Sequence, residues 1–395
     1  MVKESMNMKD VTISQSVRYV GVDDKTIDLF EGQYKVPNGV SYNSYVILDD
    51  KIAVMDTVDK RATTQWLSNV EAVLDGRKPD YLVITHMEPD HAGSIQVLAE
   101  KYPEMELIAS VKAVSMIPQF FSMENVGCRC HGVKEGETLS LGAHTLHFVM
   151  APMVHWPEVM VAYESSEKIL FSADGFGKFG ALDIEEDWTC EARRYYINIV
   201  GKYGAQVQAL LKKAAALDIQ TICPLHGPIL KENLGFYLNK YDIWSSYRPE
   251  EEGVLVAYAS IHGNTAGAAK QMAQMLKAKG EENVEVMDLA RDDMAEAVEN
   301  AFRYSRMVVA ASSYDAGLFP PMDTFLRKLK AKNFQNRRVA VIENGSWAPS
   351  AAKCMNALLG EMKNITVCGT VTIHSAVKPE NVEEMEALAD ALLEK

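Results

Sequence analysis

The sequence predicts two domains of different fold class, an α+β domain over residues 1–250 and an α/β domain over residues 254–395. Up to about residue 250, short β-rich runs come in hairpin-like pairs with helical segments between them, a pattern typical of antiparallel pairing. After residue 253, apolar strands alternate regularly with helices, which predicts a doubly wound parallel sheet. The charged segment RPEEEG at 248–253 ends in glycine and is typical of a linker.

Two pairs of apolar runs predict hairpins in the first domain. The segment SYVILDDKIAVMDT at 44–57 places two apolar runs around two aspartates. The segment VMVAYESSEKILFSAD at 159–174 places two more around a polar turn. Apolar residues at helical spacing predict helices at 62–76 and 94–102. We therefore expect the first domain to mix helices with largely antiparallel strands.

Strands and helices alternate through the second domain. Apolar runs predict strands at 254–260, 284–289, 306–313 and 337–344, and the helix after the first of them extends to about Lys279. The acidic C-terminal segment NVEEMEALADALLEK predicts an amphipathic helix. About 140 residues suit one domain of this kind.

The composition is that of a globular protein that acts away from nucleic acids and membranes. Apolar residues make up 48% and charged residues 24% of the 395 residues, and the net charge is −14. An acidic chain has no general attraction to phosphate backbones or anionic lipids. No apolar run approaches the ~20 residues that cross a bilayer. The N-terminal segment lacks the apolar core of a signal peptide, so we expect a cytoplasmic protein.

The cysteines are scattered along the chain. They are Cys128, Cys130, Cys190, Cys223, Cys354 and Cys368, and no C-x-x-C pair occurs among them. This spacing argues against a disulfide framework, a zinc ribbon and a fused rubredoxin-type iron centre. We expect these residues to be buried thiols in a reducing compartment.

The densest group of metal-binding residue types lies in VITHMEPDHAGS, between an apolar run and a helix. Four such residues fall within six positions: His86, Glu88, Asp90 and His91. A strand end is a rigid platform, and the loop beyond it can fold around an ion. Asp90 alone could cap the helix, but packing does not explain four such side chains together. The segment therefore predicts a metal site.

Three further candidates follow or close predicted strands. His155 lies in APMVHWPEVM, Asp174 ends the strand KILFSAD, and His226 lies in TICPLHGP after an apolar strand. Because each stands at a strand end, all of them can converge at one edge of a sheet. Other histidines of the β-rich stretch are interpreted as ordinary polar positions, namely His131, His144 and His147.

The segment GFGKFG at 175–180 matches the dinucleotide pattern G-x-G-x-x-G. That fingerprint must open a helix inside a parallel β-α-β unit. The residues that follow, ALDIEEDW, do not start a convincing helix. We interpret the glycines as a sharp turn just after Asp174.

Three polar loops follow strand ends in the second domain. The first, SIHGNT, opens a helix and offers hydroxyls and backbone N–H groups to a phosphate. It is not a Walker A loop, because G-x-x-x-x-G-K-[ST] is absent. Ligands of open α/β sheets bind beyond the carboxyl ends of the strands, so the loops predict a site for a phosphate and a flat ring. The candidate residues are Ser260, His262, Gly263, Asn264, Thr265, Ser312, Ser313, Tyr314, Asp315, Gly317, Asn344, Gly345, Ser346 and Trp347.

The order H-x-E-x-D-H, then His, Asp and His at strand ends, resembles the metallo-β-lactamase superfamily, whose usual motif is H-x-H-x-D-H with zinc. With Glu88 in place of the second histidine, the motif resembles that of the flavodiiron proteins. The added carboxylate shifts the site from zinc towards iron. The resemblance implies an αββα sandwich with two non-haem irons. It assigns His86, Glu88 and His155 to one iron, Asp90, His91 and His226 to the other, and Asp174 as the bridge. In some members the histidine at the position of His91 turns away, and water replaces it.

Residues 254–395 resemble a flavodoxin domain, in which S-x-x-G-N-T is the phosphate loop. The resemblance implies a flavodoxin-like doubly wound sheet with bound FMN. It places Tyr314 and Trp347 against the flavin ring, and Asp315 and Gly317 near its redox-active edge. The two motif sets together resemble the two-domain flavodiiron proteins over nearly the whole chain.

This resemblance implies an oxidoreductase in which FMN passes electrons to a diiron centre that reduces O2 to water, NO to nitrous oxide, or both. It also implies a separate rubredoxin or a reduced deazaflavin coenzyme as donor, and a head-to-tail homodimer or a tetramer. Tyr195 and Tyr196, on the helix-like segment 190–204, are candidates for donating a hydrogen bond or a proton near the irons. Trp156 is expected to pack beside its neighbouring ligand or to line the gas pocket.

Two functions of other classes stay open from the sequence. One is a zinc hydrolase of metallo-β-lactamase type with an appended flavodoxin domain, which Glu88 disfavours. The other is a binding and electron-carrying module with a degenerate metal site, which the complete ligand set disfavours. No single residue decides between O2 and NO.

Overall fold

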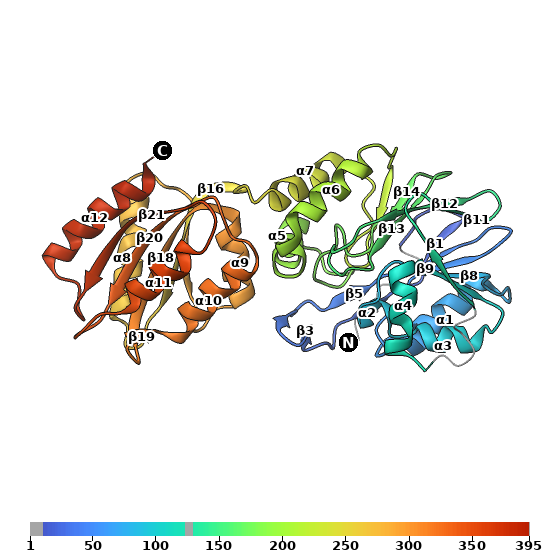
Figure 1. The fold of residues 1–395 in the computed structure, drawn as a ribbon, viewed down its shortest axis with the longest axis horizontal. Helices are drawn as coiled ribbons and strands as arrows, with labels where there is room; N and C mark the ends of the chain where they lie inside the picture. The colour runs from blue at the N-terminus through green and yellow to red at the C-terminus, as the bar shows by residue number, and fades with distance from the viewer. Residues whose placement is uncertain (1–10, 123–128, 395) are drawn as a thin grey trace. The chain divides into compact units, whose positions relative to one another are not determined.

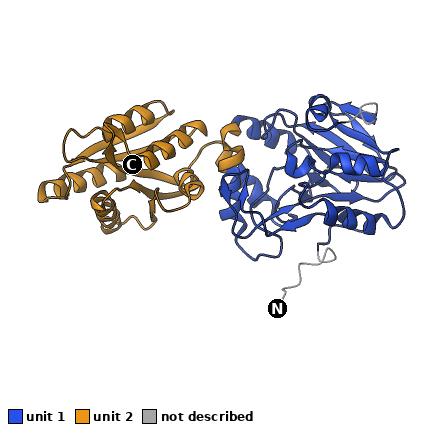
Figure 2. Ribbon diagram, turned by 90° about the horizontal axis from the view of Figure 1, so that it is seen from below, with its two compact units in different colours: residues 1–196, 205–241 blue, residues 197–204, 242–395 orange. Residues whose placement is uncertain are grey.

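The computed structural model describes residues 11–122 and 129–394 (Figure 1). Internal contacts divide the chain into two compact units (Figure 2). The first comprises Met1–Tyr196 and Ala205–Tyr241, and the second comprises Ile197–Gly204 and Asp242–Lys395. The short segment 197–204 joins the second unit through hydrogen bonds within that unit. Nδ2 of Asn198 donates to the carbonyl of Ala295 over 3.0 Å.

A six-stranded mixed sheet forms one layer of the first unit. Its strand order is β1 (Val17–Tyr19), β6 (Tyr45–Ile47), β7 (Ala53–Met55), β8 (Tyr81–Ile84), β9 (Glu106–Ser110) and β10 (Cys130–Val133). The predicted hairpin at 44–57 is the antiparallel pair β6–β7, and the strands from β7 to β10 are parallel. Two small pairs precede β6: β2 (Val22–Asp24) with β5 (Val40–Tyr42), and β3 (Leu29–Phe30) with β4 (Tyr34–Lys35).

A five-stranded sheet forms the second layer. Its order is β11 (Thr138–Ser140), β12 (Thr145–Met150), β13 (Met160–Glu164), β14 (Ile169–Phe171) and β15 (Thr221–Cys223). The predicted hairpin at 159–174 is the antiparallel pair β13–β14, and β15 runs parallel to β14. Buried residues of both sheets form one core cluster, including Ile47, Val83, Phe148 and Phe171. The two sheets therefore pack face to face.

Helices of the first unit lie outside the two sheets (Figure 1). Their bounds are α1 (Thr63–Leu74), α2 (Pro89–Ala92), α3 (Ile95–Lys101), α4 (Val111–Phe120), α5 (Trp188–Tyr195), α6 (Gly204–Ala214) and α7 (Leu234–Ser245). Between α5 and α6 the chain forms a π-helix, Tyr196–Val200, and a 3₁₀ turn, Gly201–Tyr203. Sheet faces sheet and helices cover the outer faces, so this unit is an αββα sandwich.

The second unit is built on a parallel sheet of order β17-β16-β18-β20-β21. The strands are β16 (Glu251–Ala259), β17 (Val284–Asp288), β18 (Tyr304–Tyr314), β20 (Arg337–Asn344) and β21 (Ile365–Ile373), with β19 (Gly317–Leu318) antiparallel to β18. The helices are α8 (Asn264–Ala278), α9 (Met294–Arg303), α10 (Pro320–Ala331), α11 (Ala351–Gly360) and α12 (Pro379–Leu393). Contacts group α8 with α12 and α10 with α9 and α11, so the sheet is covered on both faces. This is the doubly wound order 2-1-3-4-5.

Three sequence expectations need correction. The predicted linker at 248–253 is in part strand, because β16 begins at Glu251, which pairs with Tyr304. Strand β21 was not predicted, since its polar residues mark a partly exposed edge strand. The expectation of buried thiols holds for Cys223, whereas Cys190 is exposed. No disulfide joins the described cysteines, and Cys128 lies outside the described residues.

No helix of the described segments combines the length and the apolar character that crossing a bilayer demands.

Candidate metal centre and flavin site

All seven predicted metal ligands lie where strands of the sandwich end. His86 and Glu88 occupy the loop between β8 and α2, and Asp90 and His91 lie in the single turn of α2. The other three follow β12, β14 and β15 respectively: His155, Asp174 and His226. Strand ends of both sheets therefore meet at one edge of the sandwich, as the sequence predicts. The alternative role of Asp90 as a helix cap is not observed, because Glu88 is the N-cap residue of α2 and Asp90 lies inside the helix.

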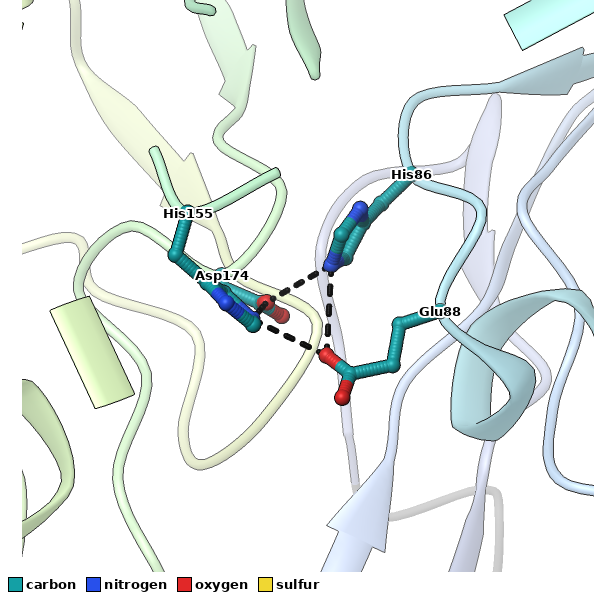
Figure 3. A group of neighbouring side chains, drawn as sticks. All are labelled: His86, Glu88, His155 and Asp174. Carbon is teal, nitrogen blue, oxygen red and sulfur yellow. Dashed lines mark hydrogen bonds and ion pairs between the residues drawn. The ribbon is translucent and has the colours of Figure 1, made fainter. Parts of the chain in front are cut away.

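The first cluster joins His86, Glu88, His155 and Asp174 (Figure 3). Oε2 of Glu88 lies 3.3 Å from Nε2 of His86 and 2.9 Å from Nε2 of His155. Oδ2 of Asp174 lies 3.3 Å from the same atom of His86 and 3.2 Å from that of His155. Two imidazole nitrogens and two carboxylate oxygens therefore surround one point.

A second cluster joins Asp90, His91 and His226. Nε2 of His91 and Nε2 of His226 are 2.9 Å apart, and each lies 3.2 Å from Oδ2 of Asp90. Oδ1 of Asp174 lies 3.3 Å from Nε2 of His91 and 3.9 Å from Nε2 of His226. The two oxygens of Asp174 thus face different clusters, which is the geometry of a bridging carboxylate.

These residues fit a pair of metal ions. Asp90 and Asp174 are buried, and their oxygens lie 3.2–3.9 Å from histidine nitrogens of the two clusters without a well-formed hydrogen bond. Buried carboxylates with such incomplete pairing carry a free-energy cost of desolvation that a bound cation removes. Three carboxylates among seven ligands form a harder donor set than the nitrogen-rich set that zinc prefers. The donor set therefore suits iron.

Two contacts from outside the clusters fix which ring nitrogen His86 and His226 turn towards the metal site. Nδ1 of His86 lies 2.8 Å from Oε1 of the buried Glu158, and Nδ1 of His226 lies 2.7 Å from the carbonyl oxygen of Ser41. A carbonyl oxygen only accepts, so Nδ1 of His226 carries a proton and Nε2 is left for a metal. Glu158 and Ser41 were not predicted from the sequence, because neither belongs to the ligand motif.

The segment from His86 to His91 is held at both ends by hydrogen bonds to the residues that follow β7. Asp56 accepts hydrogen bonds from the backbone N–H and the hydroxyl of Thr85, each over 2.7 Å. The hydroxyl of Thr57 donates to the carbonyl of His91 over 2.7 Å. Asp56 and Thr57 close a strand of the 44–57 hairpin, just as Asp174 closes its own strand. That shared position at a strand end is the sequence signal that marks Asp56 and Thr57.

Electrostatics within the clusters match a site made for cations. Burial alone would lower the pKa of His86, but the charge of Asp174 and hydrogen bonds to carboxylates raise it well above its usual value. Burial would raise the pKa of Asp90, yet the charge of His91 and the contacts with both histidines hold it low. Without metal the site therefore favours the protonated form of His86, and metal binding must displace that proton.

Tyr195 and Tyr196 lie in different surroundings. The ring of Tyr195 is 5.4 Å from the ring of His226, between centroids, and burial raises the pKa of its hydroxyl well above the usual value. Tyr196 packs on Tyr241 instead, with ring centroids 5.0 Å apart. The structure thus brings Tyr195 to the ligand cluster and turns Tyr196 towards Tyr241. A catalytic role for either tyrosine stays a prediction.

Aromatic residues close two sides of the clusters. Trp156 packs edge-on against His86 at 5.4 Å and stacks on Phe120 at 6.4 Å. Phe30, in the β3–β4 hairpin, packs edge-on against His226 at 5.4 Å. The next residue, Glu31, has a pKa of about 7, raised by burial and by the charge of Glu88. This hairpin was not predicted from the sequence, because its two strands are only two residues long.

The GFGKFG segment opens no helix, and the next helix, α5, begins at Trp188. The interpretation as a turn rather than a dinucleotide loop is consistent with that geometry. A side chain at Gly177 would meet His226 and Tyr195 at 3.4–3.5 Å. The glycine therefore lets the chain pass close to the ligand cluster.

In the second unit, the three polar loops line one open pocket of about 550 Å³. All the predicted cofactor-binding residues border it except Gly263 and Gly317. The structure adds Ile261, Ala316, Ala348, Ser350 and Ser375 to the lining. Ser375 follows β21, so the unpredicted fifth strand explains why sequence analysis missed it. The rule that loops after strand ends bind ligands would have found this residue.

The first loop presents an uncapped helix start to this pocket. Gly263 is the N-cap residue of α8 with φ of 97°, and no side chain caps the helix. The first-turn N–H groups of α8 are therefore available to an anion, and the helix dipole favours it. Beside them, the hydroxyl oxygens of the buried Thr265 and of Ser312 lie 2.8 Å apart.

The other loops that line the pocket are joined by hydrogen bonds, and they leave two aromatic rings exposed. The hydroxyl of Ser313 accepts the backbone N–H of Ser350 over 2.8 Å, and Nδ2 of Asn344 donates to the carbonyl of Ser375 over 2.8 Å. Tyr314 is 45% exposed and Trp347 is 84% exposed at the rim of the pocket. Exposed aromatic rings beside an anion site suit a phosphorylated, planar ligand.

Comparisons with known proteins agree with both halves of the structure. The family described as ODP family beta lactamase matches residues 40–227, and the flavodoxin family matches residues 256–387. The chain is 28% identical over 367 residues to the anaerobic nitric oxide reductase flavorubredoxin of Vibrio vulnificus, covering 88% of this chain and 72% of that protein.

Solved structures with the same fold are similar over almost the full length. The rubredoxin oxygen:oxidoreductase of Desulfovibrio gigas superposes with a TM-score of 0.90 at 26% identity, covering 97% of each chain. A flavoprotein of Thermotoga maritima gives 0.85 at 26% identity, covering 96% of each chain. These likenesses confirm the predicted fold class. The chain therefore joins a metallo-β-lactamase-like domain to a flavodoxin-like domain, and it is similar over nearly its whole length to solved flavodiiron proteins.

Proposed function

We propose that this protein is an FMN-dependent diiron oxidoreductase that reduces O2 to water, NO to nitrous oxide, or both. The observation that carries the proposal is the position of Asp174. Its two oxygens face two ligand clusters, each with two histidines and at least one further carboxylate. A pair of iron ions, when bound, would supply electrons to a diatomic gas, and this shared carboxylate would hold the two ions side by side.

The protein's own residues would prepare that site in three ways. Glu158 and Ser41 orient the rings of His86 and His226, so that the Nε2 atoms face the clusters. Phe30 and Trp156 shield the ligand histidines from water. The hydroxyl of Tyr195 keeps its proton, because burial raises its pKa, and can donate a hydrogen bond beside His226.

FMN in the flavodoxin-like unit would store the electrons. Its phosphate would bind at the start of α8 with Ser260, Asn264 and Thr265, and its ring would lie against Tyr314 and Trp347. The relatives named flavorubredoxin and rubredoxin oxygen:oxidoreductase support a separate rubredoxin as the donor, with a reduced deazaflavin coenzyme as the alternative. We further propose a cytoplasmic, head-to-tail homodimer or a tetramer.

Steady-state turnover with reduced rubredoxin and its reductase tests the proposal. The enzyme is prepared without oxygen, and either O2 or NO is then added to the same preparation. Consumption of either gas, with iron and FMN bound, is the expected result. Faster NO consumption with nitrous oxide formed would identify an NO reductase, and faster O2 consumption without peroxide release would identify an O2 reductase. Purified protein that holds zinc, consumes neither gas and cleaves thioesters or phosphodiesters would overturn the proposal in favour of the hydrolase.

A further inference from the structure

A small apolar cavity of about 20 Å³ lies in the first unit, between the five-stranded sheet and α6. Val149, Val161 and Leu170 form its wall on the sheet side, from β12, β13 and β14. Leu210, Leu211 and Ala214 form the opposite wall on α6. A cavity needs roughly 10–15 Å³ of this kind to hold one water-sized molecule. The space therefore accommodates one small molecule.

The wall of the cavity offers a water molecule little to bind. Almost all of it is carbon, and its polar side chains are Ser172 and Tyr241. The hydroxyl of Ser172 donates to the carbonyl of Gly175 over 2.6 Å, and the hydroxyl of Tyr241 accepts the backbone N–H of Phe176 over 2.6 Å. A bound water needs two to four polar partners, and apolar cavities of this kind stay dry and bind apolar guests such as xenon.

The lining of the cavity includes both half-buried residues of α6 and buried residues beside two metal-ligand loops. Leu210 and Leu211 are half-buried, whereas Val154 and Phe176 are buried. Val154 directly precedes His155, and Gly175 directly follows Asp174. Consecutive Cα atoms are about 3.8 Å apart, so Val154 and Gly175 bring the cavity wall next to the backbone that carries two ligands.

We propose that this cavity is a binding site for the apolar gas substrate, O2 or NO, and that gas enters it past α6 on the way to the metal clusters. This inference rests on the proposed function for the identity of the guest. Its physical basis is independent of turnover, because a dry apolar cavity next to the ligand loops favours a small uncharged gas over water and over ions.

Xenon is the probe, because it binds where small apolar gases bind and takes no part in redox chemistry. Crystals of the full-length wild-type protein under xenon pressure should show a xenon atom between Val161 and Leu211. The variant Ala214→Phe places a ring into the cavity from α6 and should abolish that peak. Ala209→Phe is the matched control, because Ala209 is exposed on the same helix and does not line the cavity. It should keep the peak.

Kinetics then test whether the bound gas reaches the metals. Ala214→Phe should lower kcat/KM for the gas several-fold, while kcat at saturating gas and the rate of FMN reduction stay at the wild-type values. Ala209→Phe should match the wild type in all three. Absence of xenon from the wild-type cavity would overturn the proposal. So would loss of xenon in Ala214→Phe with an unchanged kcat/KM for the gas, because the cavity would then lie off the route.

Failure of the proposed function gives a different result. A wild-type protein that binds xenon in the cavity but consumes neither gas would overturn the oxidoreductase proposal and the substrate role of the cavity together. A protein that consumes gas without binding xenon would overturn the cavity proposal alone.

Discussion

Oε1 of Glu158 lies 2.8 Å from Nδ1 of His86 and also accepts the backbone N–H of Met87 over 2.9 Å. Both side chains are buried, and the hydrogen bond to His86 outweighs burial to hold the pKa of Glu158 below its usual value. The carboxylate is thus ionised and fixes the imidazole so that Nε2 faces Glu88 and Asp174. Such outer partners of metal-bound histidines set ring orientation and raise ligand basicity.

Replacing Glu158 with glutamine should weaken metal binding while the fold survives. The amide keeps the shape but loses the charge that orients His86, so we expect metal affinity to fall roughly 10–100-fold. Competition with a chelator measures this affinity. Glu164→Gln is the matched control, because Glu164 is equally buried but accepts backbone N–H groups at a hairpin turn. Equal affinities in the two variants would refute the orienting role.

The variant Asp174→Asn should lose most turnover and retain FMN. An amide has one oxygen in place of two, so it cannot serve both clusters, and metal occupancy should fall with activity. Metal analysis and flavin absorbance of the same sample measure the two effects. Unchanged metal content with unchanged turnover would rule out the bridge, and loss of FMN would contradict two separable sites.

Thr265→Ala should weaken FMN binding by roughly 1–2 kcal/mol, because a hydroxyl at the helix start no longer meets the phosphate. Fluorescence titration of flavin-free protein with FMN gives the dissociation constant, and metal content should not change. Thr370→Ala, an exposed position outside the pocket, is the control. Equal FMN affinity in the two variants would place the phosphate elsewhere.

Tyr195→Phe should lower turnover and leave metal content unchanged. In our proposal the hydroxyl of Tyr195 is the group that donates a hydrogen bond or a proton at the metal site. General acid groups contribute roughly 10²–10⁴-fold to reaction rates. Tyr196→Phe separates the two candidates, because Tyr196 packs on Tyr241 instead of His226. Steady-state kcat and its pH profile are the measurements. A larger loss in Tyr196→Phe than in Tyr195→Phe would reverse the assignment.

His144 should make the stability of the first unit depend on pH. Its ring lies 2.8 Å from Asp49 and 3.2 Å from Glu167. Burial lowers the pKa of His144, but the hydrogen bonds to Asp49 and Glu167 outweigh it and raise that pKa. Hydrogen bonds from His144 likewise overcome burial and lower the pKa of Asp49 to about 2.

The raised pKa of His144 gives a stabilisation that is complete below the unfolded pKa of about 6.5 and is lost as pH rises through the folded value. The lowered pKa of Asp49 gives a second stabilisation of the folded state, which is present above about pH 4 and is lost as pH falls towards 2. His144→Gln should therefore lower the free energy of unfolding more at pH 5–6 than at pH 9, as measured by urea denaturation. His147→Gln is the control, because His147 packs on Tyr163 instead. Equal effects of His144→Gln at both pH values would refute the prediction.

Sequence by itself determined both fold classes and which residue types could hold metal ions. The hairpin at 44–57, the regular alternation after residue 253 and the strand-end placement of His155, Asp174 and His226 are local patterns. Such patterns can be recognised in the sequence alone, because hydrophobic periodicity and turn residues mark where each strand ends. The candidate metal ligands lie directly after those strand ends. The residue types alone, with Glu88 among the histidines, indicated iron in place of zinc.

Only the tertiary structure decided which groups meet across the chain. Glu158, Ser41 and Asp56 hold the ligands or their loop from segments far away in sequence, and nothing local distinguishes them from other buried polar residues. The partners of Tyr195 and Tyr196 differ although the residues are adjacent, because successive residues of a helix point about 100° apart. The apolar cavity behind α6 likewise has no pattern in the sequence, because it depends on how sheet and helix side chains fill the space between them.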